Sequence, residues 1–383
     1  MPRDISIFVS AGEASGDLHG AGLVRALFRQ APGARISCLG GRNLHEAGAA
    51  LVVDNREVAV VGGFEVARHL KSLMRAWRVI DRHLASQRPN LAVFIDFPDF
   101  NLLLARKARR FGCKVFYYIS PQVWAWRRGR VRTLRRLVDR MAVILPFESE
   151  FYAAQGMKVH YVGHPLMDVV GRAPSYLEAC GRHRPSGTEL LVGLLPGSRS
   201  GEVRMLLPIL LQAAARIKAS LPGVSFVLPV APTLTTRDLE KQVQTGESGG
   251  VPVRLVEGDT WGVIRACDLV LTASGTVTLE TAILGTPMVI LYRISKLSEP
   301  IARLLIRTPF IGLPNLIAGR AISPELIQDA ANPQSLADTA VFLLKDARRL
   351  EQQRQELAAI RALLGRSGAA ERAARLALEL VGL

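Results

Sequence analysis

The stretch from Asp268 to Leu284, DLVLTASGTVTLETAIL, predicts a strand, a turn and a helix in succession. Residues 268–272 have the length and β-branched content of a buried strand, and the residues after Thr276 have helical spacing. The turn Ser274-Gly275-Thr276 puts hydroxyl groups and free backbone N–H groups at a helix N-terminus, where negative charge is favoured. Because Ser and Thr also cap helices for structural reasons, the turn alone predicts either an anion site or a plain cap.

The same strand–helix alternation runs through most of the chain. In the first half, short apolar runs predict strands at residues 5–10, 36–39, 91–96, 114–119, 141–145 and 158–162. A second series predicts strands at 190–195, 224–230, 252–256, 268–272 and 288–292, and residues from 329 onward look helical. We therefore predict two Rossmann-like domains with doubly wound parallel sheets, residues 1–172 and 188–345, separated by a linker at 173–188. The helices of 346–383 would finish the second domain or, as we expect, join the first.

Composition limits the possible partners. The 383 residues are 49% hydrophobic and 21% charged, as in a well-packed globular protein, and carry a formal charge of +16. Such a charge favours an anionic membrane or polyanion, or serves solubility alone. The four cysteines form no CxxC pair and the seven histidines no metal-binding spacing, so we expect neither a metal nor a cofactor. With no leader and no apolar stretch of membrane-spanning length, we predict a cytoplasmic protein whose membrane contact is peripheral.

The turn after the first strand is a candidate ligand loop. It reads SAGEASGD and supplies Gly12, Glu13, Ser15, Gly16 and Asp17. It matches neither GxGxxG nor GxxxxGK[ST], so it predicts no dinucleotide fingerprint and no P-loop. A tight structural turn is the alternative, but two acids in one short loop have no obvious structural purpose and favour function.

Carboxylates also follow the strand at 91–96. Asp96 and Asp99 stand at the predicted sheet rim, a position that suits a general base, although Asp99 could simply cap the next helix. The loop after the next strand holds Gln122, Trp124 and Trp126, and its two tryptophans beside arginines suit stacking on a ring or gripping a phosphate or an acyl chain. Residues 127–140 then carry seven arginines against one acid, which indicates an anionic contact or a solvated helix face.

Two further stretches complete the candidates. The first turn of the second domain, PGSRSGE, suits a diphosphate and supplies Gly197, Ser198, Arg199 and Glu202. In the first domain, an apolar stripe with a basic opposite face includes Val61, Phe64, Leu70, Leu73 and Trp77. This stripe predicts either core packing or a helix lying on anionic lipid with acyl-chain contacts.

Taken in order, the loops SAGEASGD, DFPDFN, ISPQVWAWR, LPFE, VGHP, LPGSR, SGTVTLE and LPNLIAGR resemble those of the lipid-A-disaccharide synthase family along nearly the whole chain. The resemblance implies an inverting GT-B glycosyltransferase whose two domains face a cleft. It also implies transfer of a diacylglucosamine unit from UDP-2,3-diacylglucosamine to the 6-hydroxyl of 2,3-diacylglucosamine 1-phosphate (lipid X). The products would be UDP and the β(1→6) disaccharide 1-phosphate, made at the inner face of the cytoplasmic membrane. A homodimer is a further possibility that this family suggests.

The resemblance also gives the candidate residues their roles. Asp99 would be the base, with Asp96 as runner-up and Glu13 as a third catalytic candidate. UDP would be held by Arg199 and the Ser274 turn, including Gly275, Thr276 and Thr278, with Glu280 on the ribose. Three further residues, Tyr292, Asn315 and Arg320, would complete the substrate site.

Two alternatives remain open. One is another UDP-sugar enzyme of the same fold, either an N-acetylglucosaminyltransferase acting on lipid-linked muramyl-pentapeptide or a UDP-sugar epimerase. The other is a non-enzymatic basic protein that binds nucleic acid or membrane. No helix-turn-helix, RNP or zinc-finger pattern supports nucleic-acid binding, so we expect no nucleic-acid partner.

Overall fold

The computed structural model describes residues 5–58, 66–125, 128–244, 250–295 and 308–383, and it divides into two compact units. Unit 1 comprises residues 1–168 and 364–383, and unit 2 comprises residues 169–363. The sequence-based boundaries stood at 172, 188 and 346. The structure instead keeps residues 346–363 with the second unit, because the helix they form packs on that unit's own helices.

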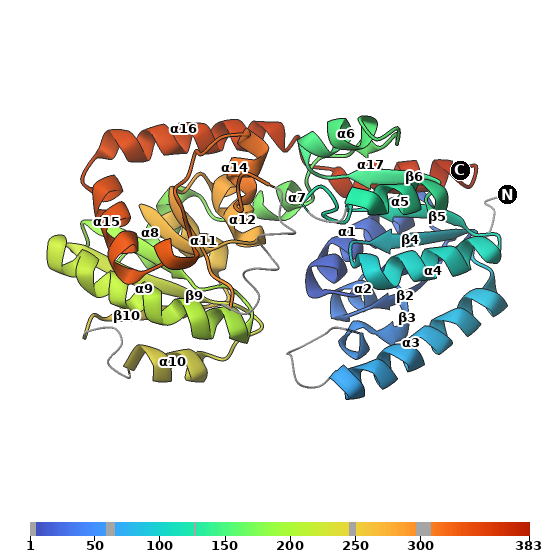
Figure 1. Ribbon diagram of the computed structural model, residues 1–383, viewed down its shortest axis with the longest axis horizontal. Helices are drawn as coiled ribbons and strands as arrows, with labels where there is room; N and C mark the ends of the chain where they lie inside the picture. The colour runs from blue at the N-terminus through green and yellow to red at the C-terminus, as the bar shows by residue number, and fades with distance from the viewer. Residues whose placement is uncertain (1–4, 59–65, 126–127, 245–249, 296–307) are drawn as a thin grey trace. The chain divides into compact units, whose positions relative to one another are not determined.

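Unit 1 is built on a seven-stranded parallel sheet of order β3-β2-β1-β4-β5-β6-β7 (Figure 1). Its strands are β1 (Ser6–Ala11), β2 (Arg35–Gly40), β3 (Ala50–Asp54), β4 (Leu91–Ile95), β5 (Lys114–Tyr118), β6 (Arg140–Val143) and β7 (His160–Tyr161). The central strands are buried on both faces, since every residue of β4 is buried, and this explains their continuous apolar runs. Sequence reasoning missed β3, a strand at the edge of the sheet with several exposed residues.

Helices cover both faces of this sheet. They are α1 (Ala14–Gln30), α2 (Arg42–Glu46), α3 (Val66–Gln87), α4 (Pro98–Arg110), α5 (Val131–Leu137) and α6 (Pro146–Ala153), with short 3-10 turns η1 (Asn55–Glu57) and η2 (Arg128–Arg130). The short helix α7 (Leu166–Val170) spans the boundary at which unit 1 passes into unit 2. Residues of α3, α4 and α5 share one hydrophobic core with the sheet. The C-terminal helix α17 (Ala369–Glu379) packs against α1, where Arg29 pairs with Glu371.

Unit 2 repeats the design with a six-stranded parallel sheet of order β10-β9-β8-β11-β12-β13. Its strands are β8 (Leu190–Leu195), β9 (Val224–Val230), β10 (Val253–Glu257), β11 (Leu269–Ala273), β12 (Met288–Tyr292) and β13 (Glu325–Ile327). Its helices are α8 (Tyr176–His183), α9 (Ser200–Ser220), α10 (Thr236–Gln244), α11 (Thr260–Ala266), α12 (Thr276–Leu284), α14 (Leu313–Ala318), α15 (Pro333–Leu344) and α16 (Ala347–Leu363), with the 3-10 turn η3 (Gln328–Ala330). The prediction of two parallel-sheet α/β domains with a helical C-terminus is confirmed.

Each sheet has one place where the strand order reverses. In unit 1 it lies between β1 and β4, and in unit 2 between β8 and β11. Ligands of doubly wound sheets bind beyond the carboxyl ends of the strands at such switch points. The topology therefore directs attention to four loops: those that follow β1, β4, β8 and β11.

Candidate functional site

The loops after β1 and β4 lie side by side at the switch point of unit 1. Ala11 pairs with Ile95 in the sheet, so the next residues, Gly12 and Asp96, leave it together. The Phe97 ring covers Gly12 so closely that a Cβ atom there would lie 2.2 Å from the ring. Gly12 is therefore required by close packing of the two loops.

Asp96 sits in a strained turn that its neighbours hold in place. Asp96 and Phe97 have φ of +42° and +47°, a left-handed conformation that is costly for residues with side chains. The Asn101 amide nitrogen donates to the Asp96 carbonyl oxygen at 2.8 Å, and the Tyr117 hydroxyl donates to the same oxygen at 2.6 Å. Ser10 in turn donates to the Asn101 side-chain oxygen at 2.6 Å. Asn101, which sequence reasoning left out of the site, is the centre of this support.

The electrostatic surroundings of the two aspartates differ. Burial, followed by the negative charge of Glu13, raises the pKa of Asp96 to about 7. Asp99 lies in the first turn of α4 with 69% of its side chain exposed, and it pairs with Arg130. Glu13 is exposed and stands as N-cap of α1, whose first turn also carries the exposed Ser15. Of the three carboxylates in these two loops, Asp99 and Glu13 are exposed, whereas Asp96 is partly buried.

Two residues of unit 1 have structural roles that their sequence context concealed. Asp17 is buried and accepts hydrogen bonds from the backbone N–H groups of Gly41 (2.6 Å) and Asn43 (3.0 Å) at the start of α2. The expectation that an acid here has no structural purpose is wrong, because Asp17 caps α2. Gly16 is buried too, beside Ala11 of β1.

The tryptophan loop is also partly structural. Trp124 is buried, its ring stands edge-on to Phe147 at 5.0 Å, and its indole N–H lies 3.3 Å from the Glu148 carboxylate. The Trp124 ring is therefore packed inside unit 1, where it cannot stack on a ligand as the sequence suggested. Gln122 is exposed, and Trp126 lies outside the described residues.

Glu148 itself is a buried acid that sequence reasoning did not select. Burial raises its pKa to about 7, although it accepts hydrogen bonds from the backbone N–H groups of Ile144 and Leu145. Through its contact with the indole N–H, Glu148 also helps to fix the position of the Trp124 ring.

Of the predicted lipid-contact stripe, the structure describes only the side chains of Leu73 and Trp77. Leu73 and Trp77 on α3 are half-buried and pack against the core, with Trp77 edge-on to Phe100 at 6.0 Å. Val61 and Phe64 lie outside the described residues, and so does the side chain of Leu70. Of the two readings left open for this stripe, core packing accounts for Leu73 and Trp77.

In unit 2, the Ser274 turn begins α12 at the carboxyl end of β11. The Ser274 hydroxyl donates to the Ile311 carbonyl at 3.1 Å, and the Thr278 hydroxyl donates to the Gly275 carbonyl at 2.7 Å. These two hydroxyls hold the turn together. Gly275 and Thr276 are exposed, and the first N–H groups of a helix have no partner within it. The turn therefore offers backbone amides to an anion.

The loop after β8 adds a cation at the same switch point. Arg199 is the N-cap of α9, its side chain is 76% exposed, and it lies 3.4 Å from Glu202. Gly197 has φ of +106°, and Glu202 packs so near that a Cβ there would lie 2.5 Å from its carboxylate. The Ser198 carbonyl accepts a 2.5 Å hydrogen bond from Thr233. An exposed guanidinium is thus carried on a firmly held turn.

Glu280 and Tyr292 complete this edge of the sheet. Burial raises the pKa of Glu280, while a 2.8 Å hydrogen bond from the Trp261 indole opposes the rise. Tyr292 ends β12 half-buried, and burial followed by the charge of Glu202 raises its pKa. Trp261, on the neighbouring helix α11, is a contact that the sequence did not reveal.

The structure corrects the prediction for Asn315, whereas the prediction for Arg320 stays a prediction. Asn315 is fully buried, its oxygen accepts from the Ser323 backbone at 2.9 Å, and its nitrogen donates to Glu325 at 2.7 Å. The polar atoms of Asn315 hydrogen-bond to the loop that leads into β13, so they are not available for the direct substrate contact that the sequence suggested. Arg320 is exposed and pairs with Glu356 at the rim of a cavity of about 620 Å³ beside α14 and α16.

Within the described residues, no group of three or more His, Cys, Asp and Glu side chains is arranged to hold a metal ion. No described helix is long and apolar enough to cross a bilayer.

Comparison with known proteins is consistent along the whole chain. The family described as "Lipid-A-disaccharide synthetase" matches residues 7–380. A lipid-A-disaccharide synthase of Syntrophus aciditrophicus is 46% identical over 375 residues, which cover 98% of this chain and 97% of the relative. A lipid-A-disaccharide synthase of Geobacter sulfurreducens is 44% identical over 376 residues, with the same coverage.

Solved structures share the fold at low sequence identity. UDP-GlcNAc 2-epimerase of Neisseria meningitidis bound to UDP-GlcNAc has a TM-score of 0.64 at 11% identity, covering 98% of this chain and 99% of that one. Acinetobacter baumannii MurG has a TM-score of 0.60 at 13% identity, with the same coverage. These structures support the GT-B architecture, and their sequences are too distant to carry more.

Proposed function

The chain belongs to the lipid-A-disaccharide synthase family, and we infer from this that it is a lipid-A-disaccharide synthase, a glycosyltransferase with a UDP-sugar donor and a lipid acceptor. The observation that carries this conclusion is similarity over nearly the full length of both this chain and its relatives. The carboxylates and the anion-binding turn at the two switch points are what such a transfer needs.

The finer chemistry is a proposal. The donor is UDP-2,3-diacylglucosamine and the acceptor is 2,3-diacylglucosamine 1-phosphate. The acceptor 6-hydroxyl oxygen attacks the anomeric carbon, the bond from that carbon to the diphosphate oxygen breaks, and UDP leaves with the electron pair. An α-linked donor then gives a β(1→6) product with inversion, so the reaction needs one base and one stabilised leaving group.

For the base we favour Asp96 over Asp99. A general base works best when its pKa lies near the working pH, and burial raises the pKa of Asp96 to about 7. Asp99 is mostly exposed and paired with Arg130, so its carboxylate is less available to a hydroxyl proton. Glu13 would act indirectly, through its charge on Asp96.

For the leaving group we propose Arg199 and the first turn of α12. An arginine fork and helix N-terminal amides both stabilise the charge that develops on a departing diphosphate. Glu280 would accept hydrogen bonds from the ribose hydroxyls, and Tyr292 lies near Glu202 at the same edge. The exposed Thr276 and the close packing at Gly197 support this arrangement.

Attachment to the cytoplasmic face of the inner membrane is also a proposal. The helices over one face of the unit 1 sheet expose many cations: Lys71, Arg75, Arg78, Arg106, Arg110, Arg132, Arg135 and Arg136. Met74 and Leu103 are exposed among them, at 46% and 48%. Basic surface with scattered apolar side chains suits anionic lipid. A homodimer rests on the family resemblance alone.

The test of function is product identification. Purified protein incubated with the two diacylated substrates should give the disaccharide 1-phosphate and UDP, detected by mass spectrometry. An epimerised donor, or transfer only to a muramyl-pentapeptide lipid, would replace this assignment with one of the alternatives.

A further inference from the structure

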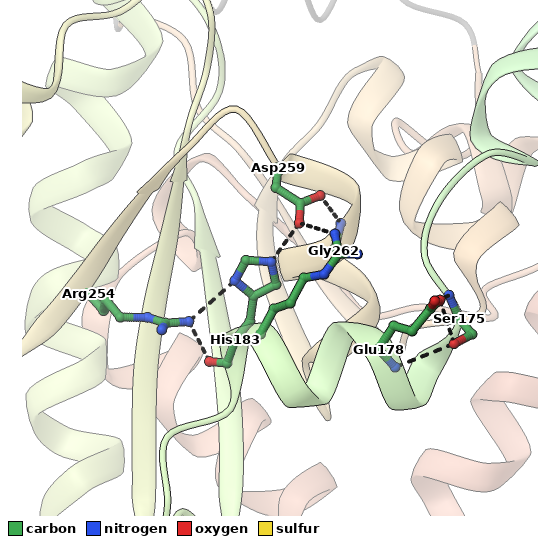
Figure 2. Close-up of polar contacts among 7 residues, drawn as sticks. Ser175, Glu178, His183, Arg254, Asp259 and Gly262 are labelled. Carbon is green, nitrogen blue, oxygen red and sulfur yellow. Dashed lines mark hydrogen bonds and ion pairs between the residues drawn. The ribbon is translucent and has the colours of Figure 1, made fainter.

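A histidine, an aspartate and an arginine meet in unit 2, where His183 lies between Asp259 and Arg254 (Figure 2). His183 is the buried last residue of α8, and its Nε2 lies 2.7 Å from Oδ2 of Asp259. Arg254 donates to the His183 carbonyl oxygen, and its Nη2 lies 3.5 Å from Nδ1 of the ring. A carboxylate can only accept, so Nε2 carries the ring proton that points at Asp259.

Asp259 in turn fixes the start of α11. It is the N-cap of that helix, and its Oδ1 accepts a hydrogen bond from the Gly262 backbone N–H at 3.0 Å. Burial alone would raise the pKa of Asp259. The hydrogen bonds from His183 and Gly262, with the charges of His183 and Arg182, outweigh burial and bring this pKa below its ordinary value. The cap is therefore held as a carboxylate between α8 and α11.

The helix that Asp259 caps carries a contact to the proposed ribose-binding residue. Trp261, in the first turn of α11, donates its indole N–H to Glu280 at 2.8 Å. A helix as short as Thr260–Ala266 has little stability of its own, so its position depends on its cap and its packing. α8 and α11 pack against each other directly.

We propose that His183 is a positioning residue for the nucleotide-binding part of the site: through the Asp259 cap it sets the place of α11, so that Trp261 orients the Glu280 carboxylate. This inference rests on the proposed role of Glu280 at the ribose. His183 does not touch the substrate and has no part in bond breaking.

The experiment measures UDP binding by isothermal titration calorimetry, and the KM for each substrate, for the wild type, His183→Ala and His183→Gln. His183→Ala should weaken UDP binding about 10-fold, the equivalent of one lost charge-assisted hydrogen bond. The donor KM should rise while the acceptor KM stays unchanged. The glutamine amide nitrogen can take the place of Nε2, so His183→Gln should recover most of the affinity.

The matched control is Ser175→Ala at the opposite end of the same helix (Figure 2). Ser175 forms a capping box with Glu178, donating to that carboxylate at 2.8 Å, so its loss should lower the melting temperature without changing UDP affinity. Trp261→Phe, which keeps the ring but removes the N–H donor, should match His183→Ala, and the two changes together should cost little more than either one.

Wild-type UDP affinity in His183→Ala, or an equal loss in Ser175→Ala, would overturn the proposal. Should His183→Ala fail to fold, His183→Phe takes its place, because it fills the same space without an N–H donor: wild-type UDP affinity in His183→Phe would overturn the proposal. Failure of the proposed function is a separate result, since the wild-type protein would then make no disaccharide at all.

Discussion

Asn101 holds Asp96: its side-chain nitrogen lies 2.8 Å from the Asp96 carbonyl oxygen and 3.1 Å from that of Ile95. These bonds stabilise a left-handed turn at the end of β4 and set the direction of the Asp96 carboxylate. Asn101 is fully buried and lies one turn into α4, so the helix itself supports the strained loop.

Removing this support should impair turnover. In Asn101→Ala the two carbonyl groups lose a buried donor, and we expect a loss of about 1–3 kcal/mol in the free energy of unfolding and roughly 10- to 100-fold in kcat. Urea titration and steady-state kinetics measure the two effects. Ser10→Ala, which removes only the bond to the Asn101 oxygen, should have a smaller effect on kcat. A full kcat in Asn101→Ala would mean that the turn does not orient the base.

The pH dependence should report Asp96. A base must be deprotonated to act, so kcat/KM should fall as pH drops through about 7. Because a single proton is involved, log(kcat/KM) should fall by about one for each pH unit below that point. In Glu13→Gln a negative charge beside Asp96 is lost, which should lower its pKa and move this fall to lower pH. Profiles of the two proteins, measured side by side at constant ionic strength, test both statements. An identical profile in Glu13→Gln would show that Glu13 does not influence the base.

Arg199 should act on the donor alone. Arg199→Ala removes the guanidinium expected on the diphosphate, so kcat/KM for the donor should fall about 100-fold while the acceptor KM stays the same. Arg199→Lys keeps the charge and should recover part of the activity, because a lysine cannot reproduce a two-pronged contact. Steady-state kinetics with each substrate varied in turn make the measurement. A rise in the acceptor KM instead would place Arg199 at the lipid phosphate.

Asp17 should affect stability and leave binding intact. In Asp17→Asn an acceptor oxygen facing the start of α2 becomes an N–H₂ group, so the free energy of unfolding should drop by about 1–3 kcal/mol. At a temperature where the variant is folded, both KM values should equal those of the wild type. Weakened substrate binding in a fully folded variant would return Asp17 to the ligand loop.

Part of this structure could be predicted from the sequence. Apolar runs predicted the central strands, such as β4, because both of their faces are buried. The edge strands β3 and β13 are only partly buried and gave no such signal. The helix α8 was missed inside the expected linker 173–188, although Ser175 and Glu178 carry the spacing of a capping box.

The candidate site was predictable in position but only partly in role. Residues after β1 and β4 in unit 1, and after β8 and β11 in unit 2, could be selected because neighbouring parallel strands end at the same edge of their own sheet. The role of Asp17 depends on backbone groups of α2, 24 or more residues away, so no local pattern reveals it. The choice of Asp96 over Asp99 as the base depends on burial and on a left-handed turn. The local sequence DFPD predicts neither of these features.

The most direct test compares Asp96→Asn with Asp99→Asn in the disaccharide-forming reaction, with UDP binding measured for both proteins. We predict that Asp96→Asn lowers kcat by about 10²- to 10⁴-fold with unchanged UDP affinity, the usual contribution of a general base. Asp99→Asn, which weakens a largely exposed ion pair with Arg130, should stay within about 10-fold of the wild type. A full kcat in Asp96→Asn together with a collapse in Asp99→Asn would contradict the account and make Asp99 the base.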